Sequence, residues 1–271
     1  MIKHVGFWFI ILNFSLHANA QLRLPAMVSD SMVLQRDRPV NIWGWWKGEG
    51  PVTVQFRGKQ YKAIADNQQR WQIQLPATPA GGPYSLTIQA GNETRTIQDV
   101  LMGDVWLCSG QSNMEFIMGK LTEKYPNEIA QSANPWIREF QVTLQYAMHP
   151  KEELNGKWRV ANPANIGSFS AVGYFMVKAL YDRYKVPMAV IKSTWGGTPA
   201  ESWISEEGLR DFSGYLERYH YYQDSANMNA AIQRERTVTS QWQSAAKAGD
   251  IGLLSENNWK SNDFPAEKIG K

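Results

Sequence analysis

Two serines and two amide side chains directly follow a hydrophobic run in the stretch GDVWLCSGQSNMEF, residues 103–116. The run VWLC predicts a short buried strand, and Ser112 stands just beyond its end. A serine hydroxyl is a poor nucleophile until a base removes its proton, and its attack on an ester creates an oxyanion that needs fixed donors. Gly110 lets the backbone approach a substrate, and Gln111 and Asn113 offer N–H groups beside the serine. The pattern is typical of an acyl-transfer site, although a polar turn after a strand would use the same residue types.

Residues 21–100 must supply part of the scaffold, and their pattern is that of an all-β sandwich. Segments such as VNIWGWW, VTVQFRG, RWQIQLP and YSLTIQAG are short, and most alternate apolar and polar residues between turn segments such as KGEGP and ATPAGGP. Four tryptophans lie here, and we expect them in the sandwich core rather than stacked on a sugar: Trp43, Trp45, Trp46 and Trp71.

After residue 100 the pattern changes to an α/β layer, predicted over residues 101–250. VWLC, WIREFQV and VPMAVIKSTW read as strands, SFSAVGYFMVKALYDRYKV as an amphipathic helix, and residues 225–248 as a polar helix. Strand, helix and strand in this order predict a parallel sheet. Because functional groups gather at the carboxyl ends of such strands, Ser112 and the loop at Gly196–Gly197 are expected at the same edge. The predicted fold is therefore mixed, with a β-sandwich followed by an α/β domain.

The first twenty residues predict a secretory signal peptide, and with it a secreted or periplasmic protein. Lys3 gives the positive start, VGFWFIILNFSL the apolar segment and ANA the cleavage site before Gln21. The alternative is an N-terminal membrane anchor, but the run is shorter than the ~18 apolar residues of a span. Cleavage would leave no membrane anchor.

Charge and motifs exclude several classes of partner. Lys+Arg 28 against Asp+Glu 25 gives a net charge of +3, too balanced to favour nucleic acid or an anionic membrane as the main partner. No Walker loop, CxxC pair or HExxH motif indicates a cofactor or a metal. The single cysteine, Cys108, lies in an apolar run and is interpreted as a small hydrophobe.

At these residues the chain resembles a known family. GDVWLCSGQSNMEF is similar to the nucleophile block of the sialate O-acetylesterases, a branch of the SGNH (GDSL-like) hydrolases. RWQIQLPATPAGGPYSLTI and DVLMGDVW resemble the family's β domain and its junction, and FSAVGYFMVKAL and KSTWGGTPAESW its next two blocks. The resemblance covers nearly all of the chain from residue 21 to about Trp203.

The resemblance implies roles for individual residues. Ser112 would be the nucleophile, with Ser109 the less favoured serine because it precedes the glycine. Gly173 would give an oxyanion-hole N–H, with Gly197 as the second candidate and close helix packing as the other reading of Gly173. Gln111 and Asn113 would orient the loop.

The resemblance also suggests residues that contact the sugar. For the two tryptophans of this set a core position is an equal alternative, and for the glutamate a structural hydrogen-bonding role is favoured over acid catalysis. The set is Trp195, Thr198, Glu201 and Trp203.

The chain departs from the family after these blocks. Neither the later YQGE-x-N block nor a C-terminal Asp and His in a D-x-x-H arrangement is present. His149 precedes a proline in a predicted loop, and His220 lies in an aromatic segment, so neither is a good candidate for the base. We therefore expect a truncated chain, inactive by itself, with residues 251–271 as the start of a missing or inserted region and with too few strands to close its sheet.

These observations predict an exported carbohydrate O-acetylesterase, or part of one, that acts through a serine acyl-enzyme. Its substrate would be an O-acetylated sialic acid or an acetylated polysaccharide, with no cofactor and no metal. The alternative is a non-catalytic carbohydrate-binding β-sandwich module. The oligomeric state is left open.

Overall fold

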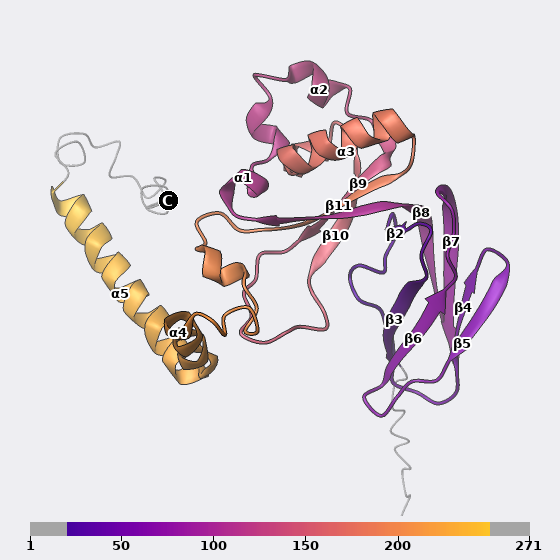
Figure 1. Cartoon of the computed structure of the whole chain (residues 1–271), viewed down its shortest axis with the longest axis horizontal. Helices are drawn as coiled ribbons and strands as arrows, with labels where there is room; N and C mark the ends of the chain where they lie inside the picture. Colours follow the sequence, from indigo (N-terminus) through magenta and orange to yellow (C-terminus); the bar gives the residue numbers. More distant parts are fainter. Residues whose placement is uncertain (1–20, 250–271) are drawn as a thin grey trace, which may run out of the picture. The chain divides into compact units, whose positions relative to one another are not determined.

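The structure is a computed structural model that describes residues 21–249. The expected signal peptide, residues 1–20, and the expected missing or inserted region, residues 251–271, lie outside this range. The described chain divides into two compact units, which Figure 1 shows in sequence colours. The first unit holds residues 21–145 and 152–198, and the second holds residues 146–151 and 199–249.

The first part of the first unit consists of strands in two sheets. The strands of the smaller sheet are antiparallel, in the order β1 (Leu22–Arg23), β3 (Val40–Trp46) and β6 (Arg70–Leu75). The larger sheet begins with β2 (Val33–Gln35), β4 (Val52–Phe56), β5 (Lys59–Ala63), β7 (Gly81–Ala90) and β8 (Glu93–Gly110). Alternate side chains of both sheets meet in one core, for example Ile42 and Ile73 with Val54 and Ile88.

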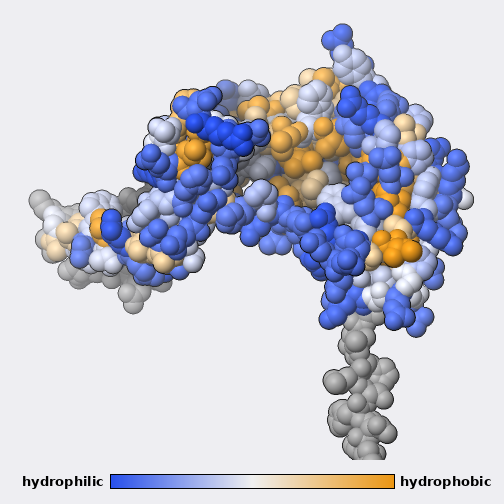
Figure 2. Space-filling model, turned by 60° about the horizontal axis from the view of Figure 1, so that its bottom comes forward, coloured by the Kyte–Doolittle hydropathy of each residue, from blue (hydrophilic) through white to orange (hydrophobic). Residues whose placement is uncertain are grey.

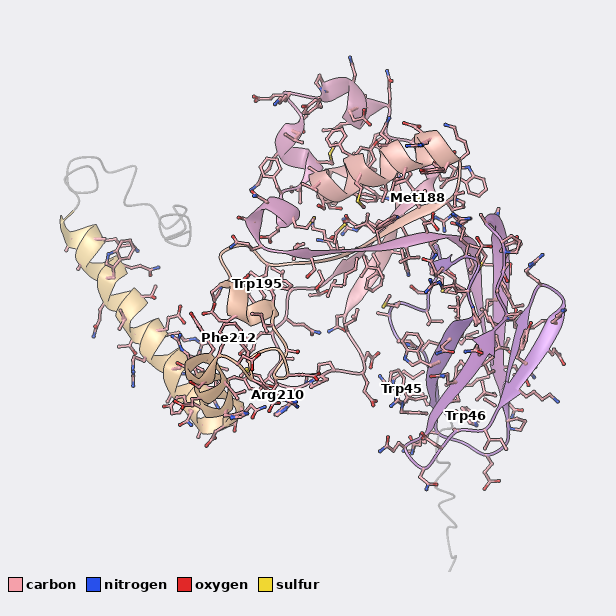
Figure 3. The ribbon with its side chains drawn as sticks, viewed as in Figure 1. Trp45, Trp46, Met188, Trp195, Arg210 and Phe212 are labelled. Carbon is pink, nitrogen blue, oxygen red and sulfur yellow. The ribbon has the colours of Figure 1, made fainter. Side chains whose placement is uncertain are left out.

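The tryptophans of this region lie mostly inward, as predicted. Trp46 and Trp71 are 2% exposed, while Trp43 and Trp45 are half-buried. The guanidinium carbon of Arg23 lies 3.6 Å from the centre of the Trp45 ring (Figure 3). A ring face covered by a cation is not free to stack on a sugar.

Strand β8 joins the two layers because it continues through both. Its first part pairs antiparallel with β7, and residues 104–110 pair parallel with β11 (Met188–Thr194). Gly103 stands where the partner changes, and a Cβ there would lie 2.2 Å from the Pro187 carbonyl oxygen. Only glycine allows this close approach of two backbones. The predicted domain boundary at residue 100 falls inside this continuous strand.

The α/β layer contains the predicted strands and helix. Its strand order is β10 (Gly156–Ala161), β9 (Asn134–Val142), β11 and β8. The last three strands are parallel to one another, and β10 is antiparallel to its neighbour β9. The long helix α3 (Ala171–Tyr184) packs on the sheet, with Tyr174 and Val177 in one core with Cys108 and Val190. Short helical turns complete the layer: α1 (Ser112–Glu115), η1 (Met118–Leu121), α2 (Pro126–Ala130) and η2 (Ile166–Ser168). The mixed α/β class is confirmed, while a sandwich followed by part of an SGNH-type domain remains a prediction.

The second unit is helical. Its elements are η3 (Ala200–Trp203), α4 (Ser213–Gln223) and α5 (Ser225–Gly249). Helix α5 matches the predicted polar helix, and none of its residues is buried. Within residues 21–249, no helix has both the length and the apolar content needed to cross a membrane.

One edge of the parallel layer is open. Along residues 104–110, no described strand pairs with the edge of β8 that faces away from β11, and the Val105 N–H donates instead to Gln35 Oε1 at 3.0 Å. Leu107 is 69% exposed and Trp106 is also exposed. Apolar areas are visible among the hydrophilic surface in Figure 2. An unpaired edge with apolar side chains is a site for association with other strands.

We expect the isolated chain to self-associate through this edge and Leu107→Lys to weaken that association at least about tenfold. Burying a leucine contributes about 1.5–3 kcal/mol, and a lysine on an edge strand opposes pairing. Sedimentation at several concentrations measures the effect. Ile64→Lys, at an apolar residue that is 80% exposed elsewhere in the unit, is the matched control. Equal weakening by both variants would show that the edge is not responsible.

Candidate active site

Ser112 lies at the carboxyl end of β8, as predicted. The strand ends at Gly110, whose φ of +137° turns the chain, and Ser112 begins helix α1 with its side chain exposed. The Trp195 N–H donates to the Gly110 carbonyl at 3.0 Å, so the residues after β11 lie beside this turn (Figure 3). The hydroxyl is therefore presented at the edge of the sheet where parallel strands end.

Gln111 connects the serine to the loop after β11. Its Oε1 accepts a hydrogen bond from Ser112 Oγ at 3.0 Å and a longer one from the Ser112 N–H at 3.4 Å. Its Nε2 donates to the Thr198 carbonyl at 3.3 Å. Gln111 thus bonds to both Ser112 and the loop after β11, and its role in orienting the loop stays a prediction. The exposed Asn113 side chain makes no hydrogen bond within the described residues.

The glycines differ in their distance from the serine. A Cβ on Gly196 would lie 3.5 Å from Ser112 Cα, so the Gly196–Gly197 loop packs against the turn that carries Ser112. Gly197 has a φ of +80°, and its N–H has no partner within the described residues. Gly173 is buried in the first turn of α3, where its N–H donates to Ser170 Oγ at 3.2 Å. The contacts of Gly173 favour close helix packing, the alternative role given for it above. The Gly197 N–H is free to donate a hydrogen bond.

Glu115 was not among the residues predicted from the sequence, yet it fixes the loop. One of its carboxylate oxygens accepts a hydrogen bond from the Gly196 N–H. Glu115 is the last residue of α1, so the same short helix carries Ser112 at one end and holds the loop after β11 at the other. The signal in the sequence that could have pointed to Glu115 is an acidic residue three positions after the candidate nucleophile Ser112.

Ser170 anchors α1 to the start of α3. Its hydroxyl donates to the Met114 carbonyl at 2.6 Å, and its N–H donates to Glu139 Oε2 at 2.9 Å. The next residue, Ala171, donates its N–H to the Phe116 carbonyl at 2.8 Å. These bonds satisfy the free groups at a helix N-terminus and hold the residues after Ser112 in place.

A buried charged group lies beneath this anchor. Glu139 is fully buried on β9, and its Oε1 has no hydrogen-bond partner within the described residues. Burial raises the pKa of Glu139 to about 7, although the Ser170 N–H and the charges of Lys192 and Arg159 lower it. Burial lowers the pKa of Lys192, whose ammonium donates to the Ser168 carbonyl at 3.0 Å.

We expect Glu139→Gln to remove a pH dependence of stability. The folded-state pKa of Glu139 lies above its ordinary value of 4.5, so the folded state binds the proton more tightly. The wild type therefore loses stability as the pH rises from about 5 to about 8, by about 2 kcal/mol from this group. Glutamine keeps the bond from Ser170 and does not ionise. Urea unfolding of both proteins at the two pH values measures the difference, and parallel pH profiles would contradict the assignment.

The remaining candidates lie in other places. Glu201 and Trp203 begin the second unit in η3, where the Ile204 N–H donates to the Glu201 carbonyl at 3.3 Å. Trp195 is half-buried and Thr198 Oγ1 donates to the Trp195 carbonyl at 2.8 Å, both in the first unit. Cys108 is buried with its pKa raised by burial, which fits an inert apolar side chain.

Both candidate histidines belong to the second unit. His220 on α4 lies 3.0 Å from Glu206 Oε1, and His149 is in the segment 146–151. The described residues of the first unit contain no histidine. The acceptor of the Ser112 hydroxyl proton is an amide oxygen, which is not a base at neutral pH. The described part of this unit thus contains the exposed Ser112 and the residues that hold it, and no histidine that could serve as its base.

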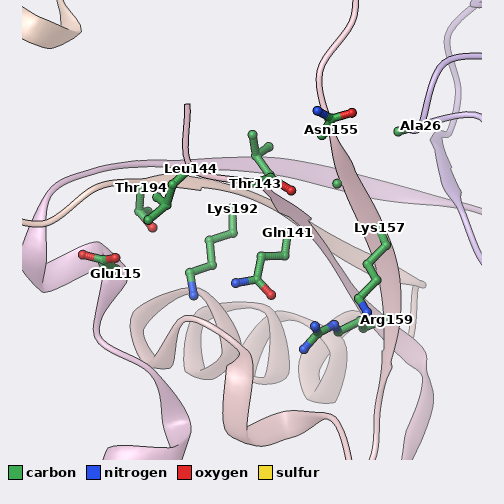
Figure 4. Close-up of a pocket in the computed structure, with 12 residues that line it drawn as sticks. Ala26, Glu115, Gln141, Thr143, Leu144, Asn155, Lys157, Arg159, Lys192 and Thr194 are labelled. Carbon is green, nitrogen blue, oxygen red and sulfur yellow. The ribbon is translucent and has the colours of Figure 1, made fainter. Parts of the chain in front are cut away.

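A cavity of about 670 Å³ lies at the carboxyl ends of β9 and β11, beside the short helix α1 that begins at Ser112 (Figure 4). Glu115 and Thr194 line it on the side of α1 and β11, and Lys157 and Arg159 line it from β10. Its volume is in the range of pockets that hold small ligands. No motif in the sequence predicted this cavity, because its lining comes from five separate segments of the chain.

Comparison with known proteins finds acetylesterases that are similar to this chain. A sialate O-acetylesterase of Rattus norvegicus is 31% identical over 220 residues, which cover 74% of this chain and 41% of the relative. The sialate O-acetylesterase of Homo sapiens is 29% identical over 213 residues, which cover 71% of this chain and 40% of the relative. The solved structure of a carbohydrate acetylesterase from Xanthomonas citri is similar with a TM-score of 0.68 and 39% identity, covering 71% of this chain and 44% of that one. No protein-family model matches the chain.

The fold is therefore similar to that of a carbohydrate acetylesterase. Within this class the comparisons confirm the resemblance to the sialate O-acetylesterase family that the motifs predicted. The chain spans about two fifths of the length of the curated relatives it matches.

Proposed function

We propose that this chain forms the nucleophile-bearing part of an exported carbohydrate O-acetylesterase. The observation that carries the proposal is the position of Ser112. It lies exposed at the carboxyl end of β8 and is held by Gln111 against the loop after β11, in a chain similar to acetylesterases. The N-terminal pattern of charge, apolar run and small residues supports export.

In this proposal Ser112 Oγ attacks the acetyl carbonyl carbon while a base takes the hydroxyl proton. The carbonyl electron pair moves to oxygen, then returns as the sugar hydroxyl leaves with a proton from the base, giving an acetyl-serine that water hydrolyses. The Gly197 N–H and the Ser112 N–H are the proposed donors to the oxyanion. Among the described residues the first has no other partner, and the second has only a long bond to Gln111.

The base and its acidic partner are proposed to lie outside the described residues. No histidine lies in the described part of the first unit, and the chain spans only part of its relatives. The chain alone would then bind an acetylated glycan without turning it over. A binding module without any reaction is the competing function, and the covered Trp45 ring gives it no support.

The test adds the part of a similar enzyme that lies outside the match with this chain. We define the complemented chain as this chain produced together with the part of the Xanthomonas citri carbohydrate acetylesterase outside the match, fused or as a second polypeptide. Release of acetate from O-acetylated sialic acid or acetylated xylan by the complemented chain would support the proposal. Retention of the glycan without acetate release, by a complemented chain that is folded, would favour the binding module.

A further inference from the structure

Glu139 is a buried carboxylate that takes no direct part in the proposed reaction. It lies on β9 with no exposed surface, and it does not line the cavity beside Ser112. Its Oε2 accepts the Ser170 N–H at 2.9 Å, and its Oε1 has no hydrogen-bond partner within the described residues. A buried carboxylate with an unpaired oxygen is less favourable than an apolar side chain of the same size. This cost is understandable if the bond to Ser170 has a role beyond core packing.

Ser170 connects this carboxylate to helix α1. While its N–H donates to Glu139, its hydroxyl donates to the Met114 carbonyl at 2.6 Å. Ser170 also forms an isolated antiparallel bridge with Ile117. Met114 lies in α1, and Ile117 follows two residues after the end of this helix. Glu139 is therefore connected by two hydrogen bonds to the helix that begins at Ser112.

Helix α1 depends on such support because it is too short to be stable by itself. It has four residues, none of them buried, and a single helical turn is unfavourable in isolation. The Phe116 N–H closes this turn on the Ser112 carbonyl at 2.9 Å, and the Glu115 carboxylate accepts the Gly196 N–H. The other support is the bond from Ser170. The position of the Ser112 hydroxyl therefore depends on bonds that other segments make to α1.

We propose that Glu139 is a positioning residue for Ser112, because Glu139 holds Ser170 and Ser170 holds α1. The inference rests on the proposed function, since it adds a residue to the same reaction. Glu139 does not touch the substrate, and its effect is to limit how far α1 can move. A shift of about 1 Å in a reacting group can lower a rate about a hundredfold. The loss of this support should therefore lower kcat and leave KM nearly unchanged.

The first measurement uses the full chain alone and follows hydrogen exchange by mass spectrometry. Glu139→Leu leaves the Ser170 N–H without its acceptor, so peptides that contain residues 112–117 should exchange about tenfold faster than in the wild type. Peptides from β4 should keep the wild-type exchange rate. Glu139→Gln retains an acceptor oxygen, so its exchange over residues 112–117 should stay within about twofold of the wild type.

The second measurement uses the complemented chain and separates kcat from KM for acetate release. Glu139→Leu should lower kcat about tenfold with KM within about twofold, and Glu139→Gln should recover most of the kcat. Val54→Ala is the control, because Val54 is fully buried in the core shared by the two sheets and a cavity there lowers stability. A loss of stability alone would affect both proteins, whereas a loss of position would affect Glu139→Leu only.

A second variant interrupts the same path if Glu139→Leu does not fold. Ser170→Ala removes the hydroxyl that donates to the Met114 carbonyl and keeps the N–H that donates to Glu139. It should give the same changes in hydrogen exchange and in kcat, because the path from Glu139 to α1 passes through this hydroxyl.

Three outcomes would overturn the inference. They are unchanged exchange over residues 112–117 in Glu139→Leu, an equal increase of exchange in β4, and a kcat that falls equally in Val54→Ala or is not recovered by Glu139→Gln. Hydrogen exchange does not involve acetate release, so the two measurements separate this inference from the proposed esterase. A complemented chain that releases no acetate, together with the expected exchange, would count against the proposed function and support the path from Glu139 to Ser112.

Discussion

Replacing Ser112 by alanine is expected to lower acetate release by the complemented chain on the order of a thousandfold or more. The hydroxyl supplies the atom that forms the acyl-enzyme, so its loss removes the reaction path rather than weakening one contact. The side chain is exposed and its only side-chain partner within the described residues is Gln111, so stability should change little. Initial rates of acetate release and urea unfolding of the same samples measure both effects.

Ser109 provides the matched control, because it lies on the same strand three residues earlier. Ser109→Ala should keep the activity, since Ser109 pairs in the ladder opposite Ser193 and precedes the turn at Gly110. An active Ser112→Ala protein together with an inactive Ser109→Ala protein would move the nucleophile to Ser109.

The second large effect concerns the uncomplemented chain, which should hydrolyse p-nitrophenyl acetate with almost no Ser112-dependent turnover. The Ser112 hydroxyl donates to the Gln111 amide oxygen, which cannot hold its proton, and only part of an oxyanion hole is present among the described residues. The assay compares the chain with Ser112→Ala, so that any background hydrolysis cancels.

Ser112-dependent turnover of even about one per second, near the low end for enzymes, would show that a base has been missed. His220 would then be the first residue to replace, because it is already paired with Glu206 as a catalytic histidine is paired with a carboxylate. His149 would be the second.

Much of the fold could be predicted, because local patterns determine it. The strands read from WIREFQV and VPMAVIKSTW are β9 and β11, and the helix read from SFSAVGYFMVKALYDRYKV is α3. For the helix the agreement is partial, because α3 buries Tyr174 and Val177 while Val172 is 50% exposed. Ser112 was placed at a strand end by the same reasoning, because an apolar run followed by glycine and polar residues ends a strand in a turn.

The features that could not be predicted depend on contacts between distant segments. The predicted boundary at residue 100 separates VWLC from the β-sandwich, but residues on both sides of it form one strand, β8, because Gly103 lets the backbone before β11 pass close to it. The bond between Glu115 and Gly196 and the meeting of Lys157, Arg159 and Lys192 at one cavity arise from strand order and register. No spacing along the chain reveals such pairs.

The measurement that tests the central claim most directly is covalent labelling with a fluorophosphonate, followed by peptide mass spectrometry. The account predicts that the label is found on Ser112 in the complemented chain, that an acetylated sugar competes with it, and that the uncomplemented chain is labelled far more slowly. A label on Ser109 or another residue, or acetate release by a complemented chain whose Ser112 is never labelled, would contradict it.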